Sequence, residues 1–200
     1  MKQQIFVIHG GNASPTYDEY LDYLRNKQVT LEGLASKDWK SHLQQELGDA
    51  YIVYQPTMPN RKYARYLEWK IWFEKYIPFF EDDVILIGHS LGGIFLAKYL
   101  SEETITKKIR ATILVAAPYN RGAEPMADFL LPESLEKMEQ QAGDIFLYHS
   151  KNDPIVPFQH LEEYQRALPR AHALPFENQG HFIEEIFPEM TEGIRKLAQS

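Results

Sequence analysis

Short apolar runs alternate along the chain with longer stretches of helical pattern, and this alternation restricts the possible fold more than any other feature. Six runs read as strands: Gln4–His9, Tyr51–Gln55, Val84–His89, Ala111–Ala117, Ile145–Ser150 and Ala171–Phe176. Most of them are consecutive apolar residues, which is typical of strands covered on both faces. The alternation predicts an α/β fold, with a six-stranded parallel sheet and helices on both faces.

The stretches between the strands carry helix signals at their ends. Ser14 and Pro15 read as a cap followed by proline in the first turn, and Gly48 and Gly143 read as helix stops. Helices are expected within residues 36–48, 60–77, 133–143 and 188–199. No repeat, low-complexity tract or linker interrupts the pattern, so we expect one domain over residues 1–200.

Composition excludes several classes of function. The net charge is -7 and no cluster of Lys and Arg is visible, which argues against a nucleic-acid partner. The absence of cysteine excludes disulfides, thiolate metal sites and a cysteine nucleophile. No apolar run approaches the roughly 18 residues of a membrane span, and none near the start resembles a signal peptide. We therefore expect a cytoplasmic protein with no membrane partner, and the sequence carries no sign of its oligomeric state.

The third apolar run leads directly into Gly88-His89-Ser90-Leu91-Gly92, a match to the pattern G-x-S-x-G. In this pattern the serine lies in a strained strand-to-helix turn, so the residues two positions away on either side must be small. The turn exposes the Ser90 hydroxyl and places the Leu91 N–H at a helix N-terminus, where it can stabilise a developing oxyanion. Ser90 is therefore the predicted nucleophile.

A carboxylate and an imidazole follow two later strands. Asp153 comes after the fifth strand in "HSKNDPIVP", and His181 comes after the sixth in "ENQGHFIEE". The carboxyl ends of parallel strands share one edge of the sheet, where ligands bind. The chain order Ser90, Asp153, His181 is that of an α/β-hydrolase triad, so these residues are predicted to act as nucleophile, acid and base.

The second oxyanion donor is expected in the loop after the first strand, "HGGNASP". Gly11 N–H is the preferred donor, with Asn12 as the alternative. The residues expected near the pocket follow a strand or lie in the stretch after this loop: His9, Gly10, His89, Tyr17 and Tyr119. His9 and His89 are expected to pack or to order loops. No metal ion or organic cofactor is predicted.

The motifs "HGG", "GHSLGG", "NDPIVP" and "GHF" together resemble the α/β-hydrolase superfamily. More narrowly, the chain is similar to the compact serine hydrolases grouped with retinoblastoma-binding protein nine and the YdeN-type proteins. The resemblance implies a reduced α/β-hydrolase fold without a large lid domain and with strand order 2-1-3-4-5-6. About twenty residues, "TYDEYLDYLRNKQVTLEGLA", are inserted relative to that family before "DWKSHLQQEL". We expect residues 17–35 to form a small cap over the pocket.

The predicted activity is that of a serine hydrolase whose partner is a small-molecule acyl substrate. A carboxylic ester is expected to form an acyl-enzyme on Ser90, with amides or thioesters as further substrates. Two alternatives remain open at this point. An acyltransferase would use the same triad, and a non-catalytic binding protein would keep the fold without the chemistry.

Overall fold

A computed structural model of the chain describes residues 2–35, 37–119 and 127–198. Its centre is a six-stranded parallel sheet with the order β2-β1-β3-β4-β5-β6, which confirms the predicted fold and strand order. The strands are β1 (Gln3–Ile8), β2 (Tyr51–Tyr54), β3 (Val84–His89), β4 (Ile109–Val115), β5 (Asp144–Ser150) and β6 (His172–Phe176).

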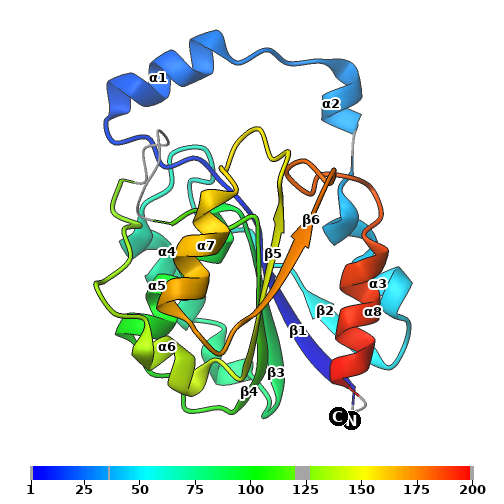
Figure 1. The fold of residues 1–200 in the computed structure, drawn as a ribbon. Helices are drawn as coiled ribbons and strands as arrows, with labels where there is room; N and C mark the ends of the chain where they lie inside the picture. Colours follow the sequence, from blue (N-terminus) through cyan, green and yellow to red (C-terminus); the bar gives the residue numbers. More distant parts are fainter. Residues whose placement is uncertain (1, 36, 120–126, 199–200) are drawn as a thin grey trace.

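Helices cover both faces of the sheet (Figure 1). On one face lie α3 (Trp39–Leu47) and α8 (Pro188–Leu197); on the other lie α4 (Tyr66–Glu74), α5 (Leu91–Glu102), α6 (Glu136–Gln141) and α7 (Gln159–Ala167). The short 3-10 helix η1 (Ile77–Phe79) leads into β3. Among the described residues, no helix has the length and apolar character needed to cross a membrane.

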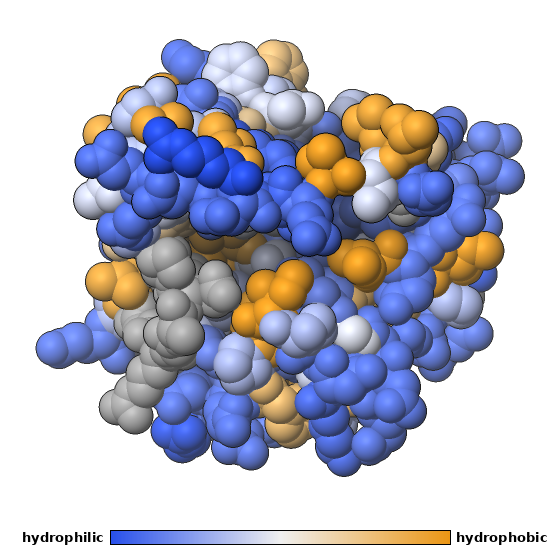
Figure 2. All heavy atoms as spheres, turned by 90° about the horizontal axis from the view of Figure 1, so that it is seen from above, coloured by the Kyte–Doolittle hydropathy of each residue, from blue (hydrophilic) through white to orange (hydrophobic). Residues whose placement is uncertain are grey.

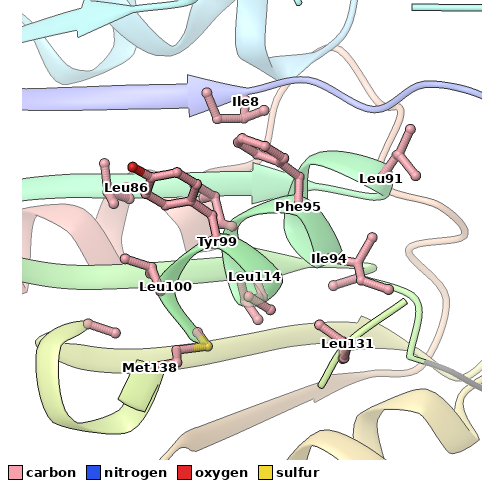
Figure 3. Close-up of a cluster of buried hydrophobic side chains, with 14 of the residues drawn as sticks. Ile8, Leu86, Leu91, Ile94, Phe95, Tyr99, Leu100, Leu114, Leu131 and Met138 are labelled. Atoms are coloured by element: carbon pink, nitrogen blue, oxygen red, sulfur yellow. The ribbon is translucent and has the colours of Figure 1, made fainter. Parts of the chain in front are cut away.

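Successive side chains of a strand point to opposite faces, so the sheet separates two hydrophobic cores. Ile5 and Val7 of β1 belong to the core under α3 and α8, while Phe6 and Ile8 belong to the core under the other helices. Figure 3 shows the second core, in which Phe95 of α5 lies near Ile8 of β1. Burial on both faces explains why the strands read as continuous apolar runs rather than as alternating ones.

Several boundaries differ from the sequence prediction by one or more residues, and the structure gives a physical reason for two of them. The first helix, α1 (Tyr17–Asn26), is capped by Thr16, whose side chain accepts a bond from the Glu19 N–H, and not by Ser14. β4 begins two residues earlier than expected, because Ile109 pairs with Val84 before an irregularity in the register. The structure also contains α7, which the capping signals had not indicated because Phe158 at its start provides no side-chain cap.

The weakest predicted strand, which contains Pro175, is the edge strand β6. Proline has no N–H to donate and is tolerated at a sheet edge. The loops that follow β1, β3, β5 and β6 all leave from the carboxyl edge of the sheet. α1 and α2 (Leu31–Ala35) lie beyond this edge, at the top of Figure 1.

Candidate active site

Ser90 lies in a strained turn between β3 and α5, with φ of 55° in the left-handed region. Its N–H donates to the Val115 carbonyl oxygen at 2.8 Å, which ties the turn to β4. A Cβ on Gly88 would lie 2.4 Å from the Gly92 oxygen, and one on Gly92 would lie 2.2 Å from the Ile8 oxygen. Both positions therefore require glycine, and the close approach of α5 to β1 and β3 keeps Ser90 at the sheet edge.

Gly93, the residue after Gly92, allows a close contact with the end of a neighbouring strand. A Cβ there would lie 2.6 Å from the Ala117 Cβ, just beyond β4. The glycine therefore lets the first turn of α5 approach the end of the neighbouring strand, and its own strand is approached less closely.

Asp153 and His181 are joined by a hydrogen bond, although α7 and β6 separate them in the sequence. His181 Nδ1 lies 2.8 Å from Asp153 Oδ2, while Asp153 Oδ1 accepts the N–H groups of Ile155 and Val156 at 2.8 and 2.9 Å. Burial raises the pKa of the Asp153 carboxyl, but the bond and charge of His181 and the two amides outweigh it, so the pKa is lowered overall. The group is thus held as a carboxylate that orients the imidazole.

Side chains on neighbouring segments fix the loop that carries His181. Asn152 Oδ1 accepts the Gly180 N–H at 2.8 Å, on one side of the imidazole. On the other side, Trp39 Nε1 donates to the Phe182 oxygen at 3.0 Å. The loop is therefore held by both the segment after β5 and the start of α3.

Two buried polar side chains, His89 and Lys40, form a hydrogen-bonded series that holds the backbone of His181. His89 Nε2 lies 2.8 Å from the His181 oxygen, and its Nδ1 lies 3.1 Å from Lys40 Nζ. Since a carbonyl can only accept and an ammonium can only donate, His89 is neutral and protonated on Nε2. Burial first, and then the charge of Lys40, hold the pKa of His89 well below its usual range. Lys40 is in turn paired with Asp38 at 2.5 Å.

The loop after β1 approaches Ser90 closely. A Cβ on Gly10 would lie 3.0 Å from the Ser90 Cβ. His9 Nδ1 donates to the Gly10 oxygen at 2.7 Å, and its Nε2 accepts the Met58 N–H at 2.9 Å. Arg61 Nε also donates to the Gly10 oxygen, at 3.0 Å. His9 and Arg61 thus hold the loop in place beside the serine.

The two candidate oxyanion donors of this loop differ in whether their N–H groups are already hydrogen-bonded. Asn12 N–H donates to the Arg61 carbonyl oxygen at 2.9 Å and is already engaged. Among the hydrogen bonds of the described residues, none uses the Gly11 N–H. Leu91 is the first residue of α5, so its N–H precedes the first intrahelical bond. Gly11 and Leu91 therefore offer N–H groups that are not engaged in hydrogen bonds among the described residues, and a Cβ on Gly11 would lie 3.1 Å from the Leu91 side chain.

Ser90 and His181 line a common hollow of about 240 Å³. The remaining lining residues come from five loops, from the end of β3 and from the helices α1 and α3: Gly10, Gly11, Asn12, Tyr23, Asp38, Lys40, Arg61, Lys62, His89, Ile155 and Ile183. Figure 2, which looks onto this side of the molecule, shows a recess bordered by hydrophilic and hydrophobic residues. Within the described ranges, no three His, Asp or Glu side chains are grouped as metal ligands.

Three expected pocket residues, His9, Tyr17 and Tyr119, do not line this hollow, and His9 instead holds the loop after β1. Tyr119 packs edge-on against Tyr164, with ring centroids 4.9 Å apart, and its N–H donates to His160 Nδ1. Tyr17 is 59% exposed. On the same helix, Tyr23 lines the hollow, so α1 does border the site but with a different tyrosine.

The charged lining residues Asp38, Lys40, Arg61 and Lys62 are not among the residues predicted from the sequence. Lys40 lies between the apolar positions of an amphipathic helix, where a lysine reads as surface. Arg61 and Lys62 lie in "PNRKYAR", in the loop after β2. Their position after a strand, at the same edge of the sheet as Ser90, is the signal that could have identified this basic pair.

Comparisons with known proteins bear on the family and the fold of the chain. The family model described as serine hydrolase matches residues 30–199. The Bacillus subtilis protein YdeN is 24% identical over 188 residues, covering 92% of this chain and 88% of YdeN. The crystal structure of YdeN superposes with a TM-score of 0.77 at 20% identity and full coverage of both chains. A YdeN-like protein from Pectobacterium atrosepticum gives 0.63 at 17% identity, covering 98% of this chain and 90% of the other.

Proposed function

The chain belongs to the serine hydrolase family, and from this premise we propose that it hydrolyses small carboxylic esters through an acyl-enzyme on Ser90. One observation carries the proposal: a serine in a strained strand-to-helix turn shares a hollow with a histidine that is bonded to a buried carboxylate. This is the arrangement of nucleophile, base and orienting acid that acyl transfer requires.

In the first half of the reaction, Ser90 Oγ attacks the acyl carbon while His181 Nε2 takes the hydroxyl proton. Asp153 keeps the other proton of the ring on Nδ1, which leaves Nε2 free to accept. The tetrahedral intermediate then collapses, and the C–O bond to the leaving alcohol breaks as His181 returns the proton to it. A water molecule attacks the resulting acyl-enzyme in the same way and releases the acid and free Ser90.

The negative oxygen of both tetrahedral intermediates would be stabilised by the Leu91 and Gly11 N–H groups. We prefer Gly11 to Asn12 because the Asn12 N–H is already bonded to Arg61. Donors that are fixed before the reaction stabilise the developing charge without reorganisation. Each is expected to contribute a factor of about 10² to 10³ to kcat.

The volume of the hollow favours a small substrate. At about 240 Å³ it lies below the roughly 300–1,000 Å³ of pockets for drug-sized ligands. We therefore expect short-chain esters to be turned over faster than long-chain ones, with amides and thioesters as slower substrates.

A fluorophosphonate probe tests the proposed nucleophile directly. Such a probe should label the wild-type protein and fail to label Ser90→Ala, and ester turnover should fall by roughly 10⁶ as for other serine triads. Ser101→Ala is a matched control, because Ser101 lies on the same helix and its hydroxyl donates to the Ala97 carbonyl oxygen. Labelling that persists in Ser90→Ala would contradict the assignment. A folded wild type that is not labelled would favour a non-catalytic binding protein.

A further inference from the structure

The hollow beside Ser90 contains more positive than negative charge. Lys40, Arg61 and Lys62 line it together with a single carboxylate, Asp38. The whole chain has a net charge of -7, so the local excess of positive charge is opposite in sign to the net charge of the protein. A cleft lined by one sign of charge attracts ligands of the opposite sign.

The three cations are not equivalent. Lys40 is buried, with only 6% of its side chain exposed, and it is paired with Asp38 and bonded to His89. It is therefore part of the scaffold under His181. Arg61 and Lys62 are exposed, and among the described residues no carboxylate pairs with either of them.

Arg61 is held at the hollow by a hydrogen bond to the loop after β1. Its Nε is used to hold the Gly10 oxygen, next to Ser90, which leaves the terminal nitrogens of the guanidinium for a ligand. Its charge also reaches the interior of the site. After burial and the closer charges of Lys40 and His181, Arg61 further lowers the pKa of His89.

The lining of the hollow also has an apolar part, made by Ile155 and Ile183. Both side chains are exposed, at 47% and 63%, although they lie beside the candidate site. The hollow thus presents an apolar contact and a cationic contact to the same ligand. A small ester with a hydrocarbon part and a negatively charged group matches both.

We propose that the substrate ester carries a carboxylate, and that this group binds at Arg61 and Lys62 while the ester carbonyl lies at Ser90. The inference rests on the proposed ester hydrolysis and names its substrate class. The guanidinium fork matches the two oxygens of a carboxylate, and the neighbouring ammonium adds a second charge-assisted bond. The carboxylate could belong to the acyl part or to the alcohol part of the ester.

Two pairs of substrates distinguish these sources. For the acyl side, the para-nitrophenyl monoester of glutaric acid is compared with its methyl ester, which lacks the charge. For the alcohol side, para-acetoxybenzoate is compared with its methyl ester. We expect the wild type to prefer the anion by about tenfold or more in kcat/KM in one of the two pairs. This preference should weaken between low salt and 1 M salt, because both cations are exposed.

Lys62→Gln is the informative variant, because Arg61 also holds Gly10 and its loss would disturb the loop. The anion-to-neutral ratio of kcat/KM should fall by about two- to fivefold in Lys62→Gln, and further in Lys62→Glu. Lys2→Gln is the matched control. Lys2 is an exposed lysine before β1, at the amino end of the sheet, and its removal should leave the ratio unchanged.

Binding to Ser90→Ala separates this proposal from the hydrolase proposal. The anionic ester should bind to Ser90→Ala more tightly than its methyl ester, and Lys62→Gln in that background should reduce the difference, as measured by calorimetry. Such binding without any turnover by the wild type would support the anionic subsite and refute ester hydrolysis. Turnover with an anion-to-neutral ratio of one in both pairs would overturn the subsite and leave the hydrolase proposal standing.

Discussion

Replacing Asp153 by asparagine tests the role of the carboxylate, because the hydrogen bonds around this side chain fix the orientation of the new amide. The side-chain oxygen at the Oδ1 position accepts two backbone N–H groups, from Ile155 and Val156. An amide NH₂ placed there would face two donors, so the asparagine side chain must keep its oxygen in that position. Its NH₂ group then occupies the position of Oδ2, 2.8 Å from His181 Nδ1 in the wild type.

This orientation forces His181 into the wrong tautomer. Nδ1 must now accept a bond from the amide, so the ring proton moves to Nε2. A protonated Nε2 cannot take the proton of Ser90. In a serine protease the same exchange lowers kcat by about 10⁴, and we expect a similar loss here, which corresponds to about 5.4 kcal/mol in the activation barrier.

The fold should hardly change, because the asparagine side chain keeps the bonds from Ile155 and Val156 and makes a bond to His181 in the opposite direction. Loss of the charge should cost about 1 kcal/mol, or a fall of about 2–4 °C in Tm for a chain of this size. The assay is steady-state hydrolysis of a short para-nitrophenyl ester, with circular dichroism to follow unfolding. Asp83→Asn is the control, since Asp83 lies at the amino end of β3 and is paired with exposed Lys108.

A folded Asp153→Asn protein that keeps activity within tenfold of the wild type would refute this reasoning. It would mean that His181 does not depend on Asp153 for its tautomer, or that another group takes the proton. Equal loss of activity in the Asp83→Asn control would instead point to a general effect of charge.

Three further perturbations follow from the packing and the buried groups. Gly92→Ala would place a Cβ 2.2 Å from the Ile8 oxygen, so we expect the free energy of unfolding, measured in urea, to fall by about 3 kcal/mol or more. In the control Gly48→Ala the new Cβ would lie in open space, and only the backbone strain at φ of 80° should lower the free energy of unfolding, by about 1–2 kcal/mol. Gly11→Ala would place a Cβ 2.7 Å from the Arg61 oxygen and displace the proposed oxyanion donor; kcat should fall by about 10² to 10³ with little change in KM. Burial is the main cause that lowers the pKa of His9, His89, His149 and His160 in the folded chain. The unfolded chain therefore binds more protons below about pH 6.5, and stability should fall there by up to about 1.4 kcal/mol per pH unit for each such histidine. Urea midpoints at pH 7.5 and 5.5 measure this loss, and an increase in stability on acidification would contradict the neutral state of these rings.

The parts of the fold that sequence could predict are those fixed by local patterns. The strands were found because most of them are apolar runs, and the roles of Ser90, Asp153 and His181 were inferred from their positions at or just after strand ends. α7 was missed because its N-cap residue, Phe158, has no capping side chain, although Leu161 and Tyr164 have helical spacing and are buried.

The charged part of the site depends on contacts between distant segments, which no local pattern records. Lys40 and His89 are 49 residues apart, and nothing in either segment indicates that a lysine would be buried against a histidine. The choice between Gly11 and Asn12 likewise depends on Arg61, whose carbonyl oxygen engages the Asn12 N–H. Such pairings become visible only when the loops are assembled at the edge of the sheet.

The segment that contains α1 and α2 has no buried residue in either helix, although it stands over the carboxyl edge of the sheet. Its visible attachments are few: Tyr20 stacks on Tyr63 at 5.0 Å, and Arg65 donates to the Ser14 and Pro15 oxygens. Substitutions here therefore cost the two cores little, while Tyr23 still borders the hollow. Variation can accumulate in this segment and alter access to the serine without endangering folding. The same property makes it the natural part of the chain to exchange when a different selectivity is wanted.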